Sequence, residues 1–273
     1  MKQFKFLMVA FSLLMGISLT SCLNSDSNTT AQRMAMAKVY SNMGIYYSFK
    51  TTTGVTITPT SASISSMKSR GVNFDALEGK VVSIMYQWDT ELMTIPNDAT
   101  KIDDVELVSI ESLNNAIEIV EEKGVSSNDS VENAAIITME GNDSFKYAPS
   151  FFDRTTLFLP INYIMYNKYH YLTLVYYPNE EQGDVMRLYL RHNDNKDVAS
   201  GSNMNSLQFA SSGYYGVGMF YHAYDMTRVF GAYGKIPEKI EIVAKENQYS
   251  LKLDDPQTEE KVYTVTFKEE TDK

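Results

Sequence analysis

The chain has few residues of the kinds that build covalent, metal or nucleic-acid sites. Its 273 residues include one cysteine, three histidines and one tryptophan. A single cysteine excludes an intrachain disulfide and any metal site made of several cysteines. There is no block of lysine and arginine, and the formal charge of −10 argues against nucleic acid as a partner. No Gly-x-Ser-x-Gly motif occurs, so the sequence gives no sign of a hydrolase nucleophile.

Apolar and aromatic residues are plentiful instead. Hydrophobic residues make up 44% of the chain and aromatic residues 12%, with 19 tyrosines and 13 phenylalanines. This content excludes a disordered or collagen-like chain and is enough for one large or two ordinary domains. Because tyrosine and phenylalanine are enriched in strands, the composition favours a mainly β protein.

The amino terminus has the pattern of a lipoprotein leader. Two lysines precede an apolar run of 14 residues, 6–19, which is too short to span a bilayer but typical of a signal peptide. The run ends in Leu19-Thr20-Ser21-Cys22, which is similar to a bacterial lipobox, whose cysteine thiol accepts a diacylglyceryl group. We therefore expect residues 1–21 to be a signal peptide and Cys22 to be the lipidation site. No later run reaches 18 apolar residues.

The residues after Cys22 indicate which membrane holds the protein and how the anchor is joined to the folded part. Leu23 stands where an aspartate would signal retention in the inner membrane, so we expect an anchor in the outer membrane through Cys22. Residues 22–34 include a polar Ser/Asn-rich stretch and are expected to form a flexible tether. The sequence leaves open whether the protein faces the periplasm or the cell surface.

Strand-like runs fall into two blocks. The first, residues 35–120, contains five short strands with turn signals between them, which fits a small Greek-key barrel of the OB type. The expected strands are residues 37–40, 45–49, 55–59, 81–88 and 105–110. Residues 121–144 are polar and are expected to form a linker or long loop, and residues 113–122 are the best candidate for a short helix.

The second block, residues 145–273, has at least six strand candidates. This number of strands predicts a carboxy-terminal antiparallel β-sandwich. The clearest candidates are residues 169–177, 185–192, 239–243 and 262–267.

Several short motifs, in this order after a lipobox, resemble the NigD-like lipoproteins of Gram-negative bacteria. The motifs are Gly54-Val55-Thr56-Ile57-Thr58-Pro59-Thr60, Leu77-Glu78-Gly79-Lys80-Val81-Val82, Leu159-Pro160-Ile161-Asn162-Tyr163, His170-Tyr171-Leu172-Thr173-Leu174-Val175 and Leu188-Tyr189-Leu190-Arg191-His192-Asn193. The resemblance implies an OB-like domain followed by a β-sandwich. It also implies an accessory or immunity role linked to a bacteriocin operon, and it supplies no catalytic residues and no cofactor.

Two histidines form the first candidate site. If residues 169–177 and 185–192 form a hairpin in which Tyr177 pairs with Val185, His170 lies directly opposite His192, with Cβ atoms ~4.5–5.5 Å apart. Two neutral histidines could supply half of a metal site, with Asp194 or Asp197 as a third ligand. The alternative is that both histidines end the core face of the hairpin and are hydrogen-bonded to backbone. For His222 we expect a structural role.

The opposite face of the same hairpin forms the second candidate site. It would hold Arg187 and Arg191 on either side of Tyr189, across from Tyr171 and Tyr177. Such a face could stack a sugar or bind an acidic ligand. The alternative is that the arginine side chains simply cover the tyrosine rings on a solvated sheet.

Two further motifs have simpler interpretations. Residues 193–197, Asn-Asp-Asn-Lys-Asp, are rich in oxygen atoms but lack the glycine and the distal glutamate of a calcium loop, so we expect a polar turn. Asp129-Ser130-Val131 is similar to the O-glycosylation signal of some Gram-negative periplasms, which makes Ser130 a candidate modification site.

From the sequence we therefore expect a non-enzymatic, lipid-anchored protein with a binding or accessory role and a protein or glycan partner. Carbohydrate binding by exposed tyrosines is one alternative. A metal-dependent hydrolase built on His170 and His192 is the other.

Overall fold

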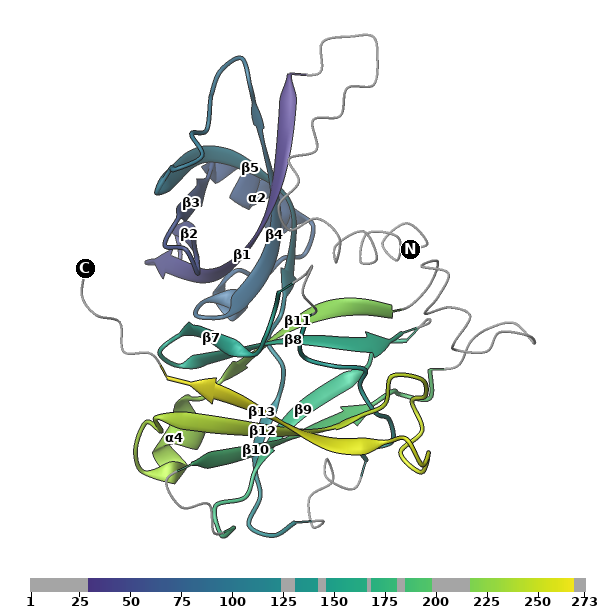
Figure 1. Ribbon diagram of the computed structural model, residues 1–273. Coiled ribbons are helices and arrows are strands. Elements are labelled where there is room, and N and C mark those ends of the chain that lie inside the picture. Colours follow the sequence, from purple (N-terminus) through teal and green to yellow (C-terminus); the bar gives the residue numbers. More distant parts are fainter. Residues whose placement is uncertain are drawn as a thin grey trace. The chain divides into compact units, whose positions relative to one another are not determined.

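The computed structural model describes residues 29–123, 131–141, 146–165, 168–180, 185–197 and 217–267. The chain divides into two compact units, one ending at Asn114 and the other starting at Asn115 (Figure 1). The expectation of a mainly β protein, with an OB-like barrel followed by a β-sandwich, is confirmed.

The first unit is a closed five-stranded barrel in which the strands follow the order β1-β2-β3-β5-β4. The β3–β5 pair is parallel and the other neighbours are antiparallel. The five expected strands are all present, as β1 (Thr30–Asn42), β2 (Tyr46–Thr51), β3 (Thr56–Pro59), β4 (Val81–Asp89) and β5 (Lys101–Ser112). The turn between β1 and β2 has the sequence Asn42-Met43-Gly44, and Met43 and Gly44 both take positive φ angles, of 56° and 69°, which tighten the hairpin.

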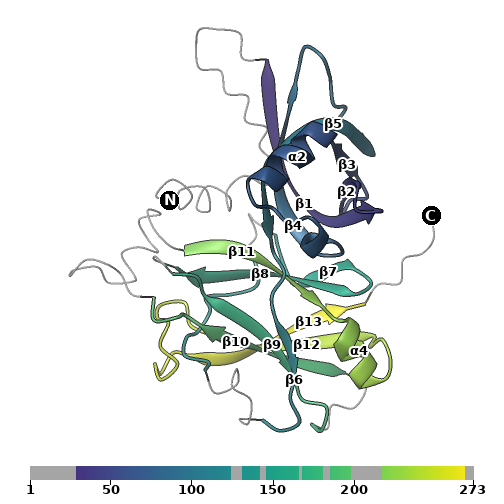
Figure 2. The same ribbon diagram turned by 180° about the vertical axis from the view of Figure 1, so that it is seen from behind.

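A helix that the sequence did not reveal lies against the barrel. Helix α2 (Ser61–Ser69) connects β3 to a short 3₁₀ turn, η1 (Asp75–Leu77), that precedes β4 (Figure 2). Thr60 caps its amino terminus by accepting a hydrogen bond from Ser63 N at 3.1 Å. Ser63 in turn accepts a bond from Leu107 N of β5 at 2.7 Å. Only Ile64 and Met67 supply large buried apolar side chains from α2, so the helix has little periodic signal.

The second unit contains two sheets. The larger sheet has the order β13-β12-β10-β9-β6, and the smaller has the order β11-β8-β7. The strands are β6 (Ile117–Ile119), β7 (Ser150–Asp153), β8 (Thr156–Ile164), β9 (Tyr171–Tyr176), β10 (Met186–Asn193), β11 (Val217–Asp225), β12 (Lys239–Glu246) and β13 (Glu259–Thr266), with helix α4 (Thr227–Tyr233) between β11 and β12. The sandwich was expected to be antiparallel, and for the larger sheet that is wrong: this sheet is mixed, because β6 pairs with β9 and β10 with β12 in parallel.

Apolar residues from both sheets meet in one core. Strand β8 contributes alternate residues Leu157, Leu159, Ile161 and Tyr163, all buried. Facing them are buried residues of the larger sheet: Leu172, Leu174, Tyr176, Met186, Leu188, Leu190, Ile240, Ile242, Tyr263 and Val265. Spacing by two places these residues on the same face of each strand, which is why the sandwich could be predicted from alternation.

The boundaries of the units differ from the expected ones. Strand β1 begins at Thr30, inside the stretch predicted as tether. Residues 117–119 form β6 in the second unit, so the short helix expected at 113–122 is wrong and the predicted first block ends too late. Part of the predicted linker is also ordered against the sandwich, since Ile136 N donates to Lys245 O at 2.9 Å and Ile137 N to Asn162 O at 2.7 Å.

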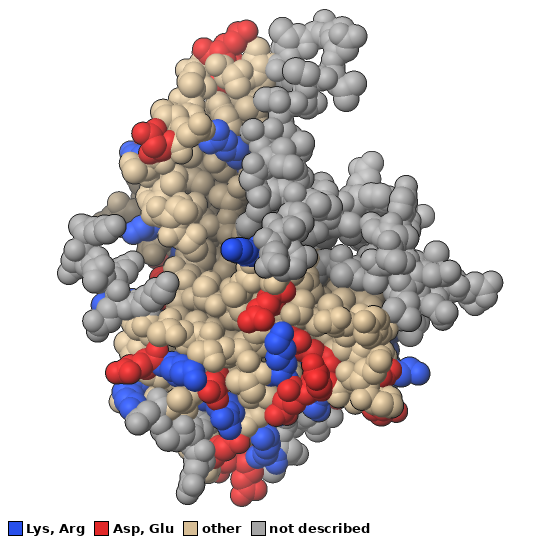
Figure 3. All heavy atoms as spheres, in the orientation of Figure 1, with Lys and Arg blue, Asp and Glu red and all other residues tan. Residues whose placement is uncertain are grey.

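Charge is mixed on the surface of the second unit. In Figure 3 acidic and basic side chains lie interspersed over its strands, and neither sign gathers into a large patch on the face shown. Many are paired, as Arg187 with Glu241 at 2.9 Å and Lys239 with the same carboxylate at 3.1 Å. Within the described residues, no helix is both long and apolar enough to cross a membrane.

Candidate functional site

The β9–β10 hairpin carries most of the candidate residues, in a register two residues away from the expected one. His192 pairs with Leu172 and Asn193 with Tyr171, so the predicted direct pairing of His170 with His192 is wrong. The connection is too long to fix the register by its turn type. A shift of two residues preserves the faces, however, so His192 and the leucines of both strands still point into the core and Tyr171 and Arg191 point outward.

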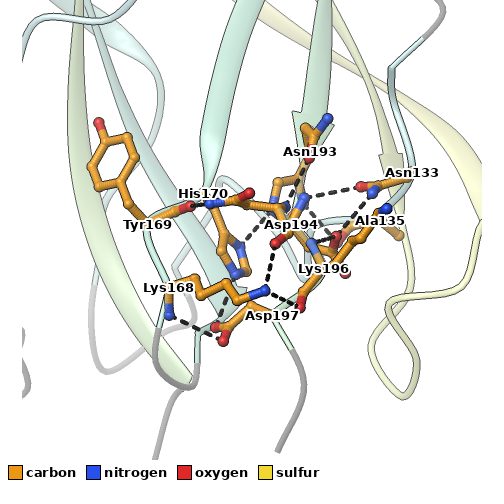
Figure 4. Close-up of polar contacts among 11 residues, drawn as sticks. Asn133, Ala135, Lys168, Tyr169, His170, Asn193, Asp194, Lys196 and Asp197 are labelled. Atoms are coloured by element: carbon orange, nitrogen blue, oxygen red, sulfur yellow. Dashed lines mark hydrogen bonds and ion pairs between the residues drawn. The ribbon is translucent and has the colours of Figure 1, made fainter.

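The two histidines are in contact despite the shifted register. His170 lies just before β9, and its Nδ1 is 2.9 Å from Nε2 of His192. The second nitrogen of His170, Nε2, is 3.2 Å from Oδ2 of Asp197 (Figure 4). The second nitrogen of His192, Nδ1, is 3.1 Å from the carbonyl of Ala135. Both rings and the carboxylate are buried, and together they form a continuous hydrogen-bonded chain.

The partners of this chain determine where its protons lie. The carbonyl of Ala135 can only accept, so His192 Nδ1 must carry a proton. Burial, followed by the nearby His170, lowers the pKa of His192 to about 3. Neutral His192 therefore accepts at Nε2, and His170 donates from Nδ1. The contact between His170 Nε2 and Asp197 then requires one further proton, which these two groups share. Burial lowers the pKa of His170, and the carboxylate of Asp197 opposes that shift.

All three histidines of the chain surround one tyrosine. The ring of Tyr163 on β8 lies 5.2 Å from that of His170, 5.3 Å from that of His192 and 5.9 Å from that of His222. His222 Nδ1 is 2.9 Å from the side-chain nitrogen of Asn115, while its Nε2 is buried without a hydrogen-bond partner. Burial lowers the pKa of His222 to about 3, so this side chain is neutral at pH 7. The structural role expected for His222 agrees with this packing.

The geometry of the histidine pair is that of a hydrogen bond. In a zinc site, a nitrogen of each histidine would direct its lone pair at one ion ~2.0–2.1 Å away. Here His170 Nδ1 instead donates a hydrogen bond to His192 Nε2. Within the described part of the chain, no group of three or more His, Cys, Asp and Glu side chains is placed to hold a metal ion. We therefore interpret the pair as part of the core.

The turn after β10 is closed by its own side chains. Asn193 Oδ1 accepts from Asn195 N at 2.8 Å, and Asp194 Oδ1 accepts from Lys196 N at 2.8 Å. Lys168 Nζ donates to the carbonyls of Asn195 and Lys196 at 3.1 and 2.8 Å (Figure 4). These bonds use the oxygen atoms that a calcium ion would need, which agrees with the expected polar turn.

Replacing Asp197 tests whether the shared proton stabilises the second unit. Asp197→Ala leaves His170 Nε2 buried without its partner, and we expect it to lower the free energy of unfolding by about 3 kcal/mol. Asp197→Asn keeps the shape and can donate to neutral His170, so its expected cost is nearer to about 1 kcal/mol. Urea denaturation at pH 7 measures both. Equal, small losses for the two variants would contradict the proton assignment.

On the outer face of the same hairpin there is a pocket of ≈ 370 Å³. It is lined by Ala116, Val131, Glu132, Tyr171, Thr173, Arg191 and Asn193. Arg191 Nη1 is 3.8 Å from Oε2 of Glu132, and Lys245 Nζ is 2.8 Å from the same oxygen. The side chains of Glu132 and Arg191 are only 7% and 11% exposed, whereas Tyr171 is 54% exposed.

The pocket includes two of the four residues expected to bind a ligand. Tyr171 and Arg191 line it. Arg187 is instead paired with Glu241, and Tyr189 is buried, with its hydroxyl donating to Glu180 at 2.6 Å and Lys123 Nζ 4.1 Å from its ring centre. Arg191 Cζ also lies 5.1 Å from the centre of the Tyr189 ring, as in the expected alternative in which arginine side chains cover tyrosine rings, although Tyr189 is buried and not solvated.

Glu132 is the residue of the pocket that sequence reasoning missed most clearly. It lies in the stretch predicted as linker, where an isolated glutamate carries no signal. The backbone of the next two residues fixes its position, because Asn133 N and Ala134 N donate to His192 O at 3.0 and 3.2 Å. The remaining predicted sites, Cys22 and Ser130, lie outside the described residues.

Comparison with known proteins supports the fold. No protein-family model matches the sequence, and no curated protein matches it significantly. Among solved structures, the chain is similar to a lipoprotein candidate from Bacteroides fragilis NCTC 9343, with a TM-score of 0.60 and 22% identity over 87% of this chain and 98% of that one. It is also similar to a protein of unknown function, DUF1344, from Bacteroides vulgatus ATCC 8482, with a TM-score of 0.50 and 12% identity over 88% and 93% of the two chains.

A third solved structure is a NigD-like immunity protein from Bacteroides caccae ATCC 43185. It has a TM-score of 0.45 and 12% identity, over 88% of this chain and 94% of that one. A TM-score at this level is too low to support a conclusion about shared function. The first two structures share the barrel-plus-sandwich fold with this chain, and at these identities the likeness extends to the fold alone.

Proposed function

We propose that this chain is a lipid-anchored protein of the NigD-like kind that binds a partner through the pocket around Tyr171 and Arg191 and performs no catalysis. The observation that carries the binding role is the pocket itself. It joins the half-exposed ring of Tyr171 to the nearly buried Arg191–Glu132 pair. Ligand-binding sites typically combine apolar side chains with a few fixed polar groups in this way.

The arrangement of the histidines supports a non-catalytic role. A general base needs a lone pair that a substrate can reach. The lone pair of His192 accepts from His170, and both rings lie in the core. The pocket is on the other side of the sheet, and the titratable side chains among its described lining residues are Glu132, Tyr171 and Arg191. The solved lipoprotein candidate with the same fold supports the anchor, and the sequence pattern at Cys22 supports its position.

Site-specific photo-crosslinking tests this binding role even though the partner is unidentified. A photoreactive phenylalanine analogue replaces Tyr171 in the full chain, which is irradiated in the cells from which the protein derives. We expect a discrete adduct, detected as a change in mass. Tyr249, which is 53% exposed and lies outside the pocket, is the matched control. Absence of an adduct at position 171, or the same adducts at both positions, would contradict the proposal.

A further inference from the structure

The chemistry of the pocket narrows the class of its ligand, if the binding role proposed above holds. We propose that the pocket binds an uncharged saccharide, either a small one or the end of a longer chain. Its size is the first argument. A volume of ≈ 370 Å³ lies near the lower end of the range of ~300–1,000 Å³ for small-molecule sites, so the pocket has room for a compact group such as one sugar ring.

The paired charges at the pocket favour an uncharged ligand. Glu132 and Arg191 contact each other at 3.8 Å, and Lys245 contacts the same carboxylate at 2.8 Å. Both Glu132 and Arg191 are nearly buried. An anion would compete with Glu132 for the two basic groups, and a cation would compete with Arg191 for the carboxylate. Separating a buried pair of this kind is strongly unfavourable, so a neutral ligand is favoured.

The hydrogen-bonding pattern suits a ligand with several hydroxyl groups. A guanidinium only donates, a carboxylate only accepts, and a hydroxyl does both. The pocket places one donor group and one acceptor group side by side at Arg191 and Glu132, and Thr173 also lines it. Neighbouring hydroxyls of one sugar ring can therefore bond to both members of the pair without separating them.

Tyr171 provides the apolar surface that a sugar ring needs. Its ring is half-exposed at the edge of the pocket, and the ring of Tyr169 meets it edge-on at 5.6 Å. A tyrosine offers a flat apolar face and a polar tip at a low cost in conformational entropy. The C–H face of a sugar ring can lie on this surface while its hydroxyls point to Arg191 and Glu132.

The sheet beneath the pocket favours a saccharide over a peptide. Peptides that bind to sheets usually extend an exposed edge strand. Here β9 pairs with β10 on one side and, at Leu174–Tyr176, with β6 on the other, and β10 also pairs with β12 at Met186–Tyr189. Past the last pair of β10 and β12, Tyr189 with Val243, residues Asn133 and Ala134 bond to the β10 backbone at His192. The pocket lies over the outer face of β9 and β10, where side chains rather than the backbone groups of a strand edge contact a ligand.

The test compares neutral and acidic oligosaccharides on the purified full-length protein. The probes are an array of gluco-, manno-, galacto- and xylo-oligosaccharides together with oligogalacturonate, followed by calorimetric titration of the strongest binder. We expect a neutral oligosaccharide to bind, with Tyr171→Ala weakening binding about tenfold or more. Tyr249→Ala is the control, and it should change the affinity by no more than about twofold.

A second variant tests the charge argument. Glu132→Gln keeps the shape of the side chain but leaves Arg191 and Lys245 without their carboxylate. We expect this variant to bind oligogalacturonate more strongly than the wild type does, and circular dichroism confirms that it is folded. A wild type that prefers the acidic probe, or that binds no saccharide, would overturn the inference. If photo-crosslinking at Tyr171 still yields an adduct in that case, the binding role stands with another ligand. If it yields none, both proposals fail.

Discussion

Replacing Cys22 by serine is expected to abolish lipid attachment to the protein. A serine hydroxyl cannot form the thioether that joins the diacylglyceryl group to the protein. Each buried acyl CH₂ group contributes ~0.8 kcal/mol, so two or three acyl chains anchor a protein stably. A protein without an acyl chain has no such anchor. Metabolic labelling with an alkyne fatty acid measures attachment directly, and membrane fractionation measures its consequence.

The neighbouring residue supplies the control for this change. Ser21→Ala keeps a small residue before the cysteine and leaves the thiol in place, so labelling should remain at the wild-type level. The label is the decisive measurement, because an uncleaved apolar leader could hold the Cys22→Ser protein at the membrane without lipid. Incorporation of the fatty acid into Cys22→Ser would rule out this cysteine as the site.

The second large effect is acid destabilisation of the unit that contains the histidines. His192 and His222 have pKa values of about 3 in the folded chain, whereas an unfolded histidine titrates near ~6.5. Their stabilisation is complete above the unfolded value. It is lost as the pH falls from there towards 3, because the unfolded chain takes up protons that the folded core excludes. The expected slope is at most about 3 kcal/mol per pH unit for both groups together.

Other buried groups modify this slope. The proton that His170 shares with Asp197 is already bound in the folded chain at pH 7, so this contact adds no loss as the pH falls. Burial raises the pKa of Glu246, so this carboxyl binds a proton more readily when folded and opposes the loss. A net loss of even half the expected size over two pH units is a large part of the ~5–15 kcal/mol that stabilises a typical domain.

Hydrogen exchange measured by mass spectrometry between pH 7 and pH 4.5 tests the prediction for each unit separately. His192→Gln and His222→Gln together should remove most of the slope from the peptides of β8, β9 and β10. A glutamine can donate to Ala135 O and accept from His170 in place of His192, so the core bonds are retained. The barrel, which contains no histidine, is the internal control. An unchanged slope in the double variant would assign the acid sensitivity to other groups.

The elements predicted correctly are those with a strong local pattern. Alternation of apolar residues marked β9, β10, β12 and β13, and turn residues separated β1, β2 and β3. Alternation also assigned the two faces of the β9–β10 hairpin. It could not fix the register, because the connection is long and a shift of two residues leaves the faces unchanged.

The parts that were missed depend on contacts distant in sequence. Helix α2 buries little apolar surface, and its position depends on a bond from Leu107 to Ser63. Strand β6 is three residues long and is defined only by its pairing with β9. Glu132 enters the pocket because residues 133–136 bond to β10 and β12, and nothing in its neighbourhood predicts those bonds. Tyr171 and Arg191 could be selected because they lie on a hairpin whose faces were readable.

The most direct measurement of the central claim is the mass of the amino-terminal peptide of the protein isolated from its own membranes. The account predicts a mature chain that starts at Cys22, with a mass increased by a diacylglyceryl group on the sulfur. An unmodified amino terminus, or a mature chain that starts at another residue, would contradict it.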